Sequence, residues 1–202
     1  MIASVFAGAL RLLCGCAARG RLPESDGRPR VYFANHTSHL DSLIVWTALP
    51  RAERRRLRIV AARDYWDRGP LRRWLACRVF RAVLVSRSAS TRRDNLITAV
   101  EGCLDAGSSV LVFPEGSRGR GAEPGTFRPG LWHIARRHPS VYLVPVWIEN
   151  LGRVLPKGEL LPLPLLAAVE FGEPVLLRED EGKGAFLARA RAAVLTLRGD
   201  RS

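Results

Sequence analysis

The chain has 202 residues, of which 47% are hydrophobic, and a formal net charge of +13. A domain of this length buries roughly 70% of the surface that it exposes when unfolded, which excludes a fold that depends on disulfide staples. Nearly all of the positive charge is arginine, and this excess indicates an anionic partner: a nucleic acid, an anionic membrane face or a phosphorylated substrate. A codon bias that favours arginine is the alternative explanation.

The cysteines show no pattern of a disulfide framework or a metal site. Cys14, Cys16, Cys77 and Cys103 have no CxxC spacing, and the first two are too close together for an easy disulfide. This usage is typical of a reducing compartment, and it predicts no structural metal.

The first 19 residues are mostly apolar, and their role is open. Arg11 interrupts the run, which is shorter than the roughly 20 residues of a spanning helix. Leu13-Cys14-Gly15-Cys16 resembles a lipoprotein cleavage box, but no positively charged stretch precedes the apolar run, as a signal peptide requires. We expect residues 1–25 to be an amphipathic helix and linker, on a membrane surface or packed on the domain, and residues 26–202 to be the domain itself.

Apolar segments alternate with helical patterns along the rest of the chain. Expected strands are 30–35, 57–62, 82–87, 109–113, 141–148 and 168–171, and expected helices are 42–49, 70–80, 90–106, 127–137 and 184–197. This order predicts an α/β fold with a mixed, largely parallel sheet flanked by helices. Pro145 favours an edge position or a bulge for its strand, and the proline-rich stretch 155–166 predicts an apolar lip or a packed loop.

Two arginine-rich stretches could contact anions. Residues 51–58 hold five arginines, and the helix expected at 70–80 is basic on one side and apolar on the other. Residues 51–58 suit contact with anionic lipid headgroups or a cofactor phosphate, and a solvated helix end or loop is the alternative. Residues 70–80 suit a membrane interface, and an ordinary amphipathic surface helix explains them at least as well.

A polar turn with His36 follows the strand expected at 30–35, and Asp41 stands where the next helix begins. There Asp41 can cap backbone N–H groups and still face His36. A histidine held by a carboxylate is the arrangement of a general base. Two unrelated polar loop residues are the alternative, and His39 is the local rival for the base.

Three of the expected strands end in polar turns, at Asn35-His36, at Ser86-Arg87 and at residues 114–118. Ligands of open α/β sheets bind outside the carboxyl ends of the strands, so we expect these turns to converge. His133 and His138 have no clear partner and are interpreted as structural or surface residues.

Several motifs in order resemble those of the glycerolipid acyltransferases, which include the 1-acyl-sn-glycerol-3-phosphate acyltransferases. Residues 35–41 (NHTSHLD) are similar to the family's NHxSxxD motif, and residues 113–118 (FPEGSR) to its FPEG[TS]R block. The block that ends in Arg87, the F[KR]xG stretch at 127–130 and the VPV block at 144–146 also match. One departure is Arg81, which occupies the place of the glycine that usually opens the Arg87 block.

The resemblance implies transfer of an acyl chain from acyl-CoA or acyl carrier protein to the free hydroxyl of a lysophospholipid. The acceptor it favours is 1-acyl-sn-glycerol-3-phosphate, which gives phosphatidate. His36 would be the base and Asp41 its orienting partner, without a metal or cofactor. Arg87 and Arg118 would hold the acceptor phosphate, and Glu115, Gly116 and Ser117 would complete the substrate-binding turn. Glu115 would accept from an acceptor hydroxyl or orient an arginine.

Other readings stay open. Asn35 and Ser38 are local candidates for oxyanion donors.

The acceptor could be another lysophospholipid or an aminolipid. A non-catalytic protein that binds anionic lipid or nucleic acid is the alternative from another class, although no nucleic-acid-binding motif is present. We expect the donor, the lysophospholipid acceptor and an anionic membrane surface as partners, with no nucleic acid. The expected location is the cytoplasmic face of a membrane, peripheral or shallowly inserted.

Overall fold

The computed structural model describes residue 8 and residues 17–19, 27–38, 40–62, 69–85, 92–119, 123–149 and 167–198. Its seven-stranded sheet has the order β1-β7-β6-β2-β5-β3-β4. The strands are β1 (Ala17–Arg19), β2 (Arg30–Ala34), β3 (Leu57–Ala62), β4 (Val83–Val85), β5 (Ser109–Val112), β6 (Tyr142–Glu149) and β7 (Ala168–Phe171). The helices are α2 (Asp41–Ala48), α3 (Arg51–Arg56), α5 (Pro70–Trp74), the π-helix η1 (Leu75–Val79), α6 (Arg92–Asp105), α7 (Gly130–Arg137) and α9 (Lys183–Thr196).

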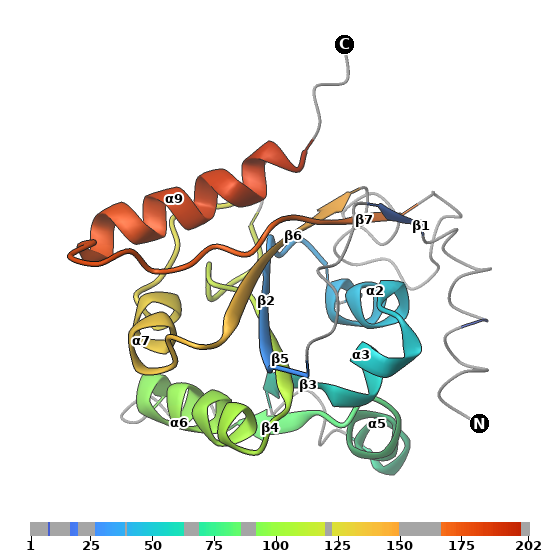
Figure 1. Ribbon diagram of the computed structural model, residues 1–202. Helices are drawn as coiled ribbons and strands as arrows, with labels where there is room; N and C mark the ends of the chain where they lie inside the picture. Colours follow the sequence, from blue (N-terminus) through green and yellow to red (C-terminus); the bar gives the residue numbers. More distant parts are fainter. Residues whose placement is uncertain are drawn as a thin grey trace.

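Every strand pair of the sheet is parallel except β6 with β7, which is antiparallel. Helices cover both faces: α6, α7 and α9 lie on one side of the sheet, and α2, α3 and α5 on the other (Figure 1). The predicted mixed, largely parallel sheet flanked by helices is therefore confirmed.

Strand β2 lies at the centre of the sheet, between β6 and β5, and contributes side chains to both hydrophobic cores. Tyr32 and Ala34 enter the core under α2, whereas Val31 and Phe33 enter the core under α6, α7 and α9. This alternation is the period of two that a strand imposes on its side chains. Because all five of its residues are buried, the strand holds the turn that follows it in a fixed place.

Strand β1 corrects part of the predicted N-terminal helix. Residues Ala17–Arg19 pair in parallel with β7, at the edge of the sheet. Without β1, the backbone N–H and C=O groups on one side of β7 would lack partners. The three residues of β1 supply these partners, although they show no hydrophobic pattern of their own. Of the residues before β1, the structure describes only Gly8, which is helical, and the predicted boundary at residues 25–26 lies outside the described residues.

Pro145 does not lie on an edge strand, because β6 is flanked by β2 and β7. The Pro145 carbonyl accepts a hydrogen bond from the Gly172 N–H at 3.0 Å, so its missing N–H faces the same side, beyond the end of β7. The β2 side of the strand needs no donor from Pro145. The prediction of an edge position is therefore wrong, and the proline is accommodated where the pairing with β7 has ended.

The helix predicted over residues 70–80 starts at Pro70 as expected and changes at Leu75 to π-helical winding, which continues to Val79. Residues 51–56, for which the sequence left a helix end or a loop open, form α3. No helix in the described ranges is long and apolar enough to cross a membrane. The proline-rich stretch 155–166 lies outside the described residues.

Candidate active site

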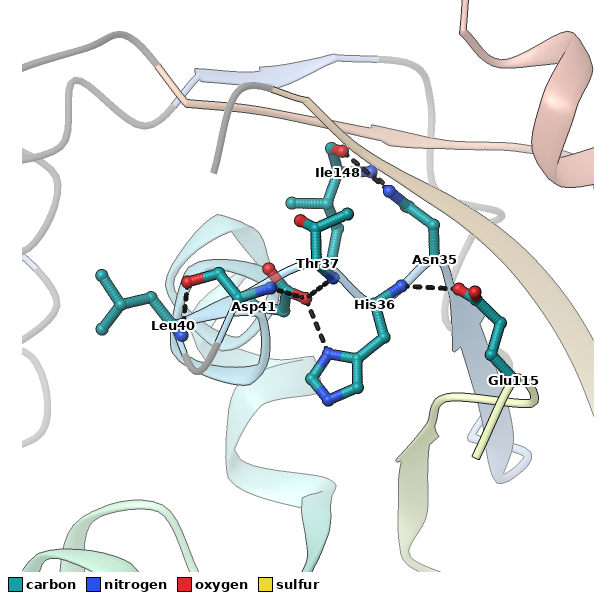
Figure 2. Close-up of polar contacts among 8 residues, drawn as sticks. Asn35, His36, Thr37, Leu40, Asp41, Glu115 and Ile148 are labelled. Carbon is teal, nitrogen blue, oxygen red and sulfur yellow. Dashed lines mark hydrogen bonds and ion pairs between the residues drawn. The ribbon is translucent and has the colours of Figure 1, made fainter. Parts of the chain in front are cut away.

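The turn after β2 brings the predicted base and carboxylate together. The His36 Nδ1 atom lies 2.7 Å from Asp41 Oδ2, and the same oxygen accepts the backbone N–H groups of Thr37 at 2.6 Å and Ser38 at 2.9 Å (Figure 2). Asp41 is fully buried. An oxygen that accepts from two backbone donors is an acceptor for the histidine as well, so the proton of the neutral ring lies on Nδ1. The lone pair of His36 is then on Nε2.

Asp41 does not cap its own helix. It is the first residue of α2, the N-cap position is Leu40, and no side-chain bond is made there. The N–H groups that Asp41 accepts precede the helix, so the carboxylate fixes the turn between strand and helix. That turn brings His36 and Asp41, five residues apart, into direct contact. On a single helix, residues five apart would not face each other.

The imidazole of His36 is held on its face as well as at its edge. Its ring stacks on the ring of Phe113, with centroids 4.1 Å apart and planes at 18°. The side chain remains 21% exposed, and Nε2 points away from Asp41 (Figure 2). The ring is thus oriented by Asp41 and Phe113, and part of the side chain stays exposed.

Glu115, in the turn after β5, binds the main chain around His36. One carboxylate oxygen accepts the His36 N–H at 2.9 Å, and the other accepts the Gly125 N–H at 2.8 Å. The Gly119 N–H in turn donates to the His36 carbonyl at 2.8 Å. Glu115 is only 8% exposed, so its carboxylate is engaged with the protein. The contact with an acceptor hydroxyl, expected from the sequence, stays a prediction.

Asn35 and Ser38 also serve the architecture of the turn. The Asn35 amide is buried and exchanges two hydrogen bonds with the main chain of Ile148, at 3.0 and 2.8 Å, which ties the end of β2 to β6. Ser38 is buried too, and its hydroxyl accepts the Leu40 N–H at 3.3 Å. Since both side chains are directed into the protein, neither is presented as an oxyanion donor.

The turn that carries Gly116, Ser117 and Arg118 lies beside the base. The Gly116 N–H donates to the Phe113 carbonyl at 3.0 Å, and the φ of Gly116 is 72°, a left-handed value that favours glycine. Ser117 and Arg118 are exposed. In the part of the chain that the structure describes, no carboxylate pairs with Arg118.

Arg87 and His39 lie outside the described residues, and their roles stay predictions. Strand β4 ends at Val85, two residues before Arg87, and lies three strand positions from β2. Neighbouring strands are about 4.8 Å apart, so the end of β4 is roughly 14 Å from the end of β2, along the same edge of the sheet.

The described residues contain no group of three His, Cys, Asp or Glu side chains that could hold a metal ion. The sequence analysis missed two parts of the site: the stacking of Phe113 and the binding of Gly125. Both residues stand in or next to the matched motifs, but only the folded chain shows what they contact.

Comparison with known proteins identifies the family. Residues 18–149 match the model of the family described as Acyltransferase. The chain belongs to this acyltransferase family. Two curated relatives are chloroplastic 1-acyl-sn-glycerol-3-phosphate acyltransferases from Arabidopsis thaliana and Brassica napus, each 28% identical over 137 residues. The matched region is 68% of this chain and 36% and 37% of theirs, so the chain spans little more than a third of these relatives.

A solved structure shares the fold of this acyltransferase-family chain. It is the 1-acyl-sn-glycerophosphate acyltransferase PlsC from Thermotoga maritima, with a TM-score of 0.74 and 18% sequence identity. The match covers all of this chain and 79% of that structure. The family resemblance inferred from the motifs is confirmed.

Proposed function

We propose that this protein transfers an acyl group from a thioester to the free hydroxyl of a lysophospholipid. The acceptor is 1-acyl-sn-glycerol-3-phosphate and the product phosphatidate. The observation that carries the proposal is the 2.7 Å contact between His36 Nδ1 and a fully buried Asp41, in a histidine whose side chain is 21% exposed. The names of the curated relatives support the choice of acceptor.

His36 acts as a general base. Its Nε2 removes the proton of the acceptor hydroxyl while the oxygen attacks the thioester carbonyl, a contribution of about 10²–10⁴-fold to the rate. The tetrahedral intermediate then collapses, the C–S bond breaks, and the imidazolium returns the proton to the leaving thiolate. Asp41 holds the ring in the required tautomer and stabilises the imidazolium between these two proton transfers.

Arg118 and Arg87 hold the phosphate of the acceptor, because a guanidinium can donate two parallel hydrogen bonds to phosphate oxygens. Ser117 lies next to Arg118 and adds a hydroxyl to the same turn. The donor is acyl-CoA or acyl carrier protein, and no metal or cofactor takes part. The anionic membrane surface that supplies the acceptor is the remaining partner, and the protein acts at the cytoplasmic face of that membrane.

The His36→Ala variant tests the mechanism. We expect acyl transfer to fall by about 10²–10⁴-fold, measured with purified protein, labelled acyl-CoA and lysophosphatidate, with the product read by mass spectrometry. His138→Ala is the matched control, since His138 also faces a carboxylate, with its Nδ1 atom 3.9 Å from Asp105 Oδ1. Normal transfer by His36→Ala would remove His36 from the mechanism.

An acceptor panel tests the substrate. If lysophosphatidate is ignored while another lysophospholipid or an aminolipid is acylated, the acceptor assignment is replaced and the base is kept. Arg81, in the place of the usual glycine, is one of the features of the sequence that leave another acceptor open. In the structure Arg81 has φ 49° and donates to the Arg55 carbonyl at 3.1 Å. A left-handed backbone explains why glycine is usual at this place, so the departure concerns the backbone rather than acceptor recognition.

A further inference from the structure

Arg128, in the F[KR]xG stretch, has no part in the mechanism above, yet it is bonded to the turn beside the base. Its Nε atom donates to the Glu115 carbonyl at 3.0 Å, and its backbone N–H donates to the Pro114 carbonyl at 2.8 Å. The neighbouring Phe127 is buried and meets Phe33 of β2 edge-on, with ring centroids 6.3 Å apart. Arg128 therefore follows a residue that packs on β2, the strand that leads into the turn of His36.

The Arg128 side chain lies directly against Gly116. A Cβ atom placed on Gly116 would come within 2.4 Å of Arg128 Nε and 2.6 Å of its Cδ, which is closer than real contacts allow. Gly116 is thus required twice, for its φ of 72° and for the room that the arginine occupies. The side chain closes over the turn and holds the Glu115–Gly116 peptide from outside.

This peptide is one bonded step from the base. The carboxylate of Glu115 accepts the His36 N–H, and Phe113, at the start of the same turn, stacks on the His36 ring. A rotation of the Glu115–Gly116 peptide would displace the carboxylate and, with it, the main chain of His36. Because a misplacement of about 1 Å can cost on the order of 10²-fold in rate, a bond that fixes this peptide matters to the chemistry.

We propose that Arg128 is a positioning residue, which acts through the hydrogen bond from its Nε to the Glu115 carbonyl and so keeps His36 in its reactive orientation. The inference rests on the proposed role of His36 as the base. Arg128 is exposed, and its terminal nitrogens have no partner within the described ranges, so direct contact with the acceptor phosphate is the competing role.

Two substitutions separate these roles. Arg128→Gln places an amide N–H where Nε stood and removes the charge. Arg128→Lys keeps the charge and puts a methylene at the position of Nε. We expect Arg128→Gln to retain kcat within about threefold and Arg128→Lys to lose about tenfold or more in kcat, with little change in the KM for the acceptor. Arg128→Met, with neither donor nor charge, gives the reference for complete loss.

A second readout does not depend on the substrate. In protein with ¹⁵N-labelled histidine, the His36 Nδ1–H bonded to Asp41 gives a downfield proton resonance, assigned by its absence in His36→Gln. We expect this resonance to persist in Arg128→Gln and to weaken or exchange faster in Arg128→Lys, both recorded below the unfolding transition. It stays measurable if the wild type ignores every acceptor, so failure of the proposed function and failure of this inference are distinguishable.

Three results would overturn the positioning role. The first is the reverse pattern, in which the lysine variant is active and the glutamine variant shows a raised acceptor KM, because that pattern marks a phosphate contact. The second is wild-type rate and resonance in all three variants. The third, decisive if no acceptor is turned over, is an unchanged resonance in Arg128→Lys.

Discussion

Strand β2 has buried polar groups at both of its ends, and they are arranged for different purposes. At its start, Arg30 is 1% exposed and lies 3.8 Å from a carboxylate oxygen of Glu53, which also accepts the Tyr32 hydroxyl at 3.0 Å. At its end, Asp41 is equally buried, but its partner His36 keeps 21% of its side chain exposed. The first cluster is enclosed, whereas the second leaves part of the His36 side chain exposed, so burial of the carboxylate alone does not distinguish the two ends.

The two clusters also differ in how their protons are held. Burial, and then the neighbouring Glu53 carboxylate, raise the pKa of Tyr32 well above its usual range, so this hydroxyl keeps its proton at every physiological pH. His36 has the Asp41 carboxylate on one nitrogen, and its side chain is partly exposed. Under the proposed mechanism, this exposure lets a proton enter and leave. Enclosure therefore suits stability, and partial exposure suits transfer.

The largest effect is expected at the open end. Asp41→Asn replaces a charged acceptor by an amide that can hold the wrong histidine tautomer, and we expect kcat to fall by about 10³–10⁴-fold. The measurement is acyl transfer at saturating acceptor. Asp105→Asn is the matched control, because Asp105 faces His138 at the surface, and it should leave the rate unchanged. A loss below tenfold in Asp41→Asn would mean that the two ends do not differ as described.

At the enclosed end the expected effect is on stability. Glu53→Gln removes the charge that faces buried Arg30, and we expect the free energy of unfolding to fall by about 3 kcal/mol, read from urea denaturation. The rate per folded molecule should stay close to that of the wild type. Loss of catalysis in a variant that is still folded would show that this cluster is coupled to the site.

A smaller effect of opposite sign is expected at Arg81, which is bonded to α3, the helix that carries Glu53. Its φ of 49° is unfavourable for a residue with a side chain, by roughly 1–2 kcal/mol, although its bond to the Arg55 carbonyl recovers part of this. We expect Arg81→Gly to raise the free energy of unfolding by up to about 1 kcal/mol and to leave acceptor preference unchanged. A changed preference in the acceptor panel would return Arg81 to substrate recognition.

Much of the fold could be read from the sequence because its strands are buried apolar runs. The ranges 57–62 and 168–171 agree with β3 and β7, since periodicity and flanking polar residues define them. Strand β1 could not be predicted, because its three residues form a strand only through the edge of β7. The internal position of β6 could not be predicted either. The sequence shows that Pro145 lacks an N–H donor, but it does not show toward which neighbouring strand that donor would point.

The sequence predicted which residues lie at the candidate site, but not what several of their side chains contact. His36 and Asp41 are near in sequence, so their contact follows from one turn. The partners of Asn35 and Glu115 lie 113 and 79 residues away, and nothing local shows that an amide binds the Ile148 main chain or that a carboxylate binds the His36 N–H. Side chains that look reactive in a motif can be occupied by distant backbone.

The hydrogen bond from the His36 N–H to Glu115 joins the turn after β2 to the turn after β5, which lie far apart in the sequence. The chain between them leaves the centre of the sheet, builds its β3–β4 edge and returns with β5. The bond survives a change in the length of this excursion provided that β5 returns beside β2. A chain cut within it would place His36 and Glu115 on separate fragments, and only reassociation of the fragments would restore the bond between them.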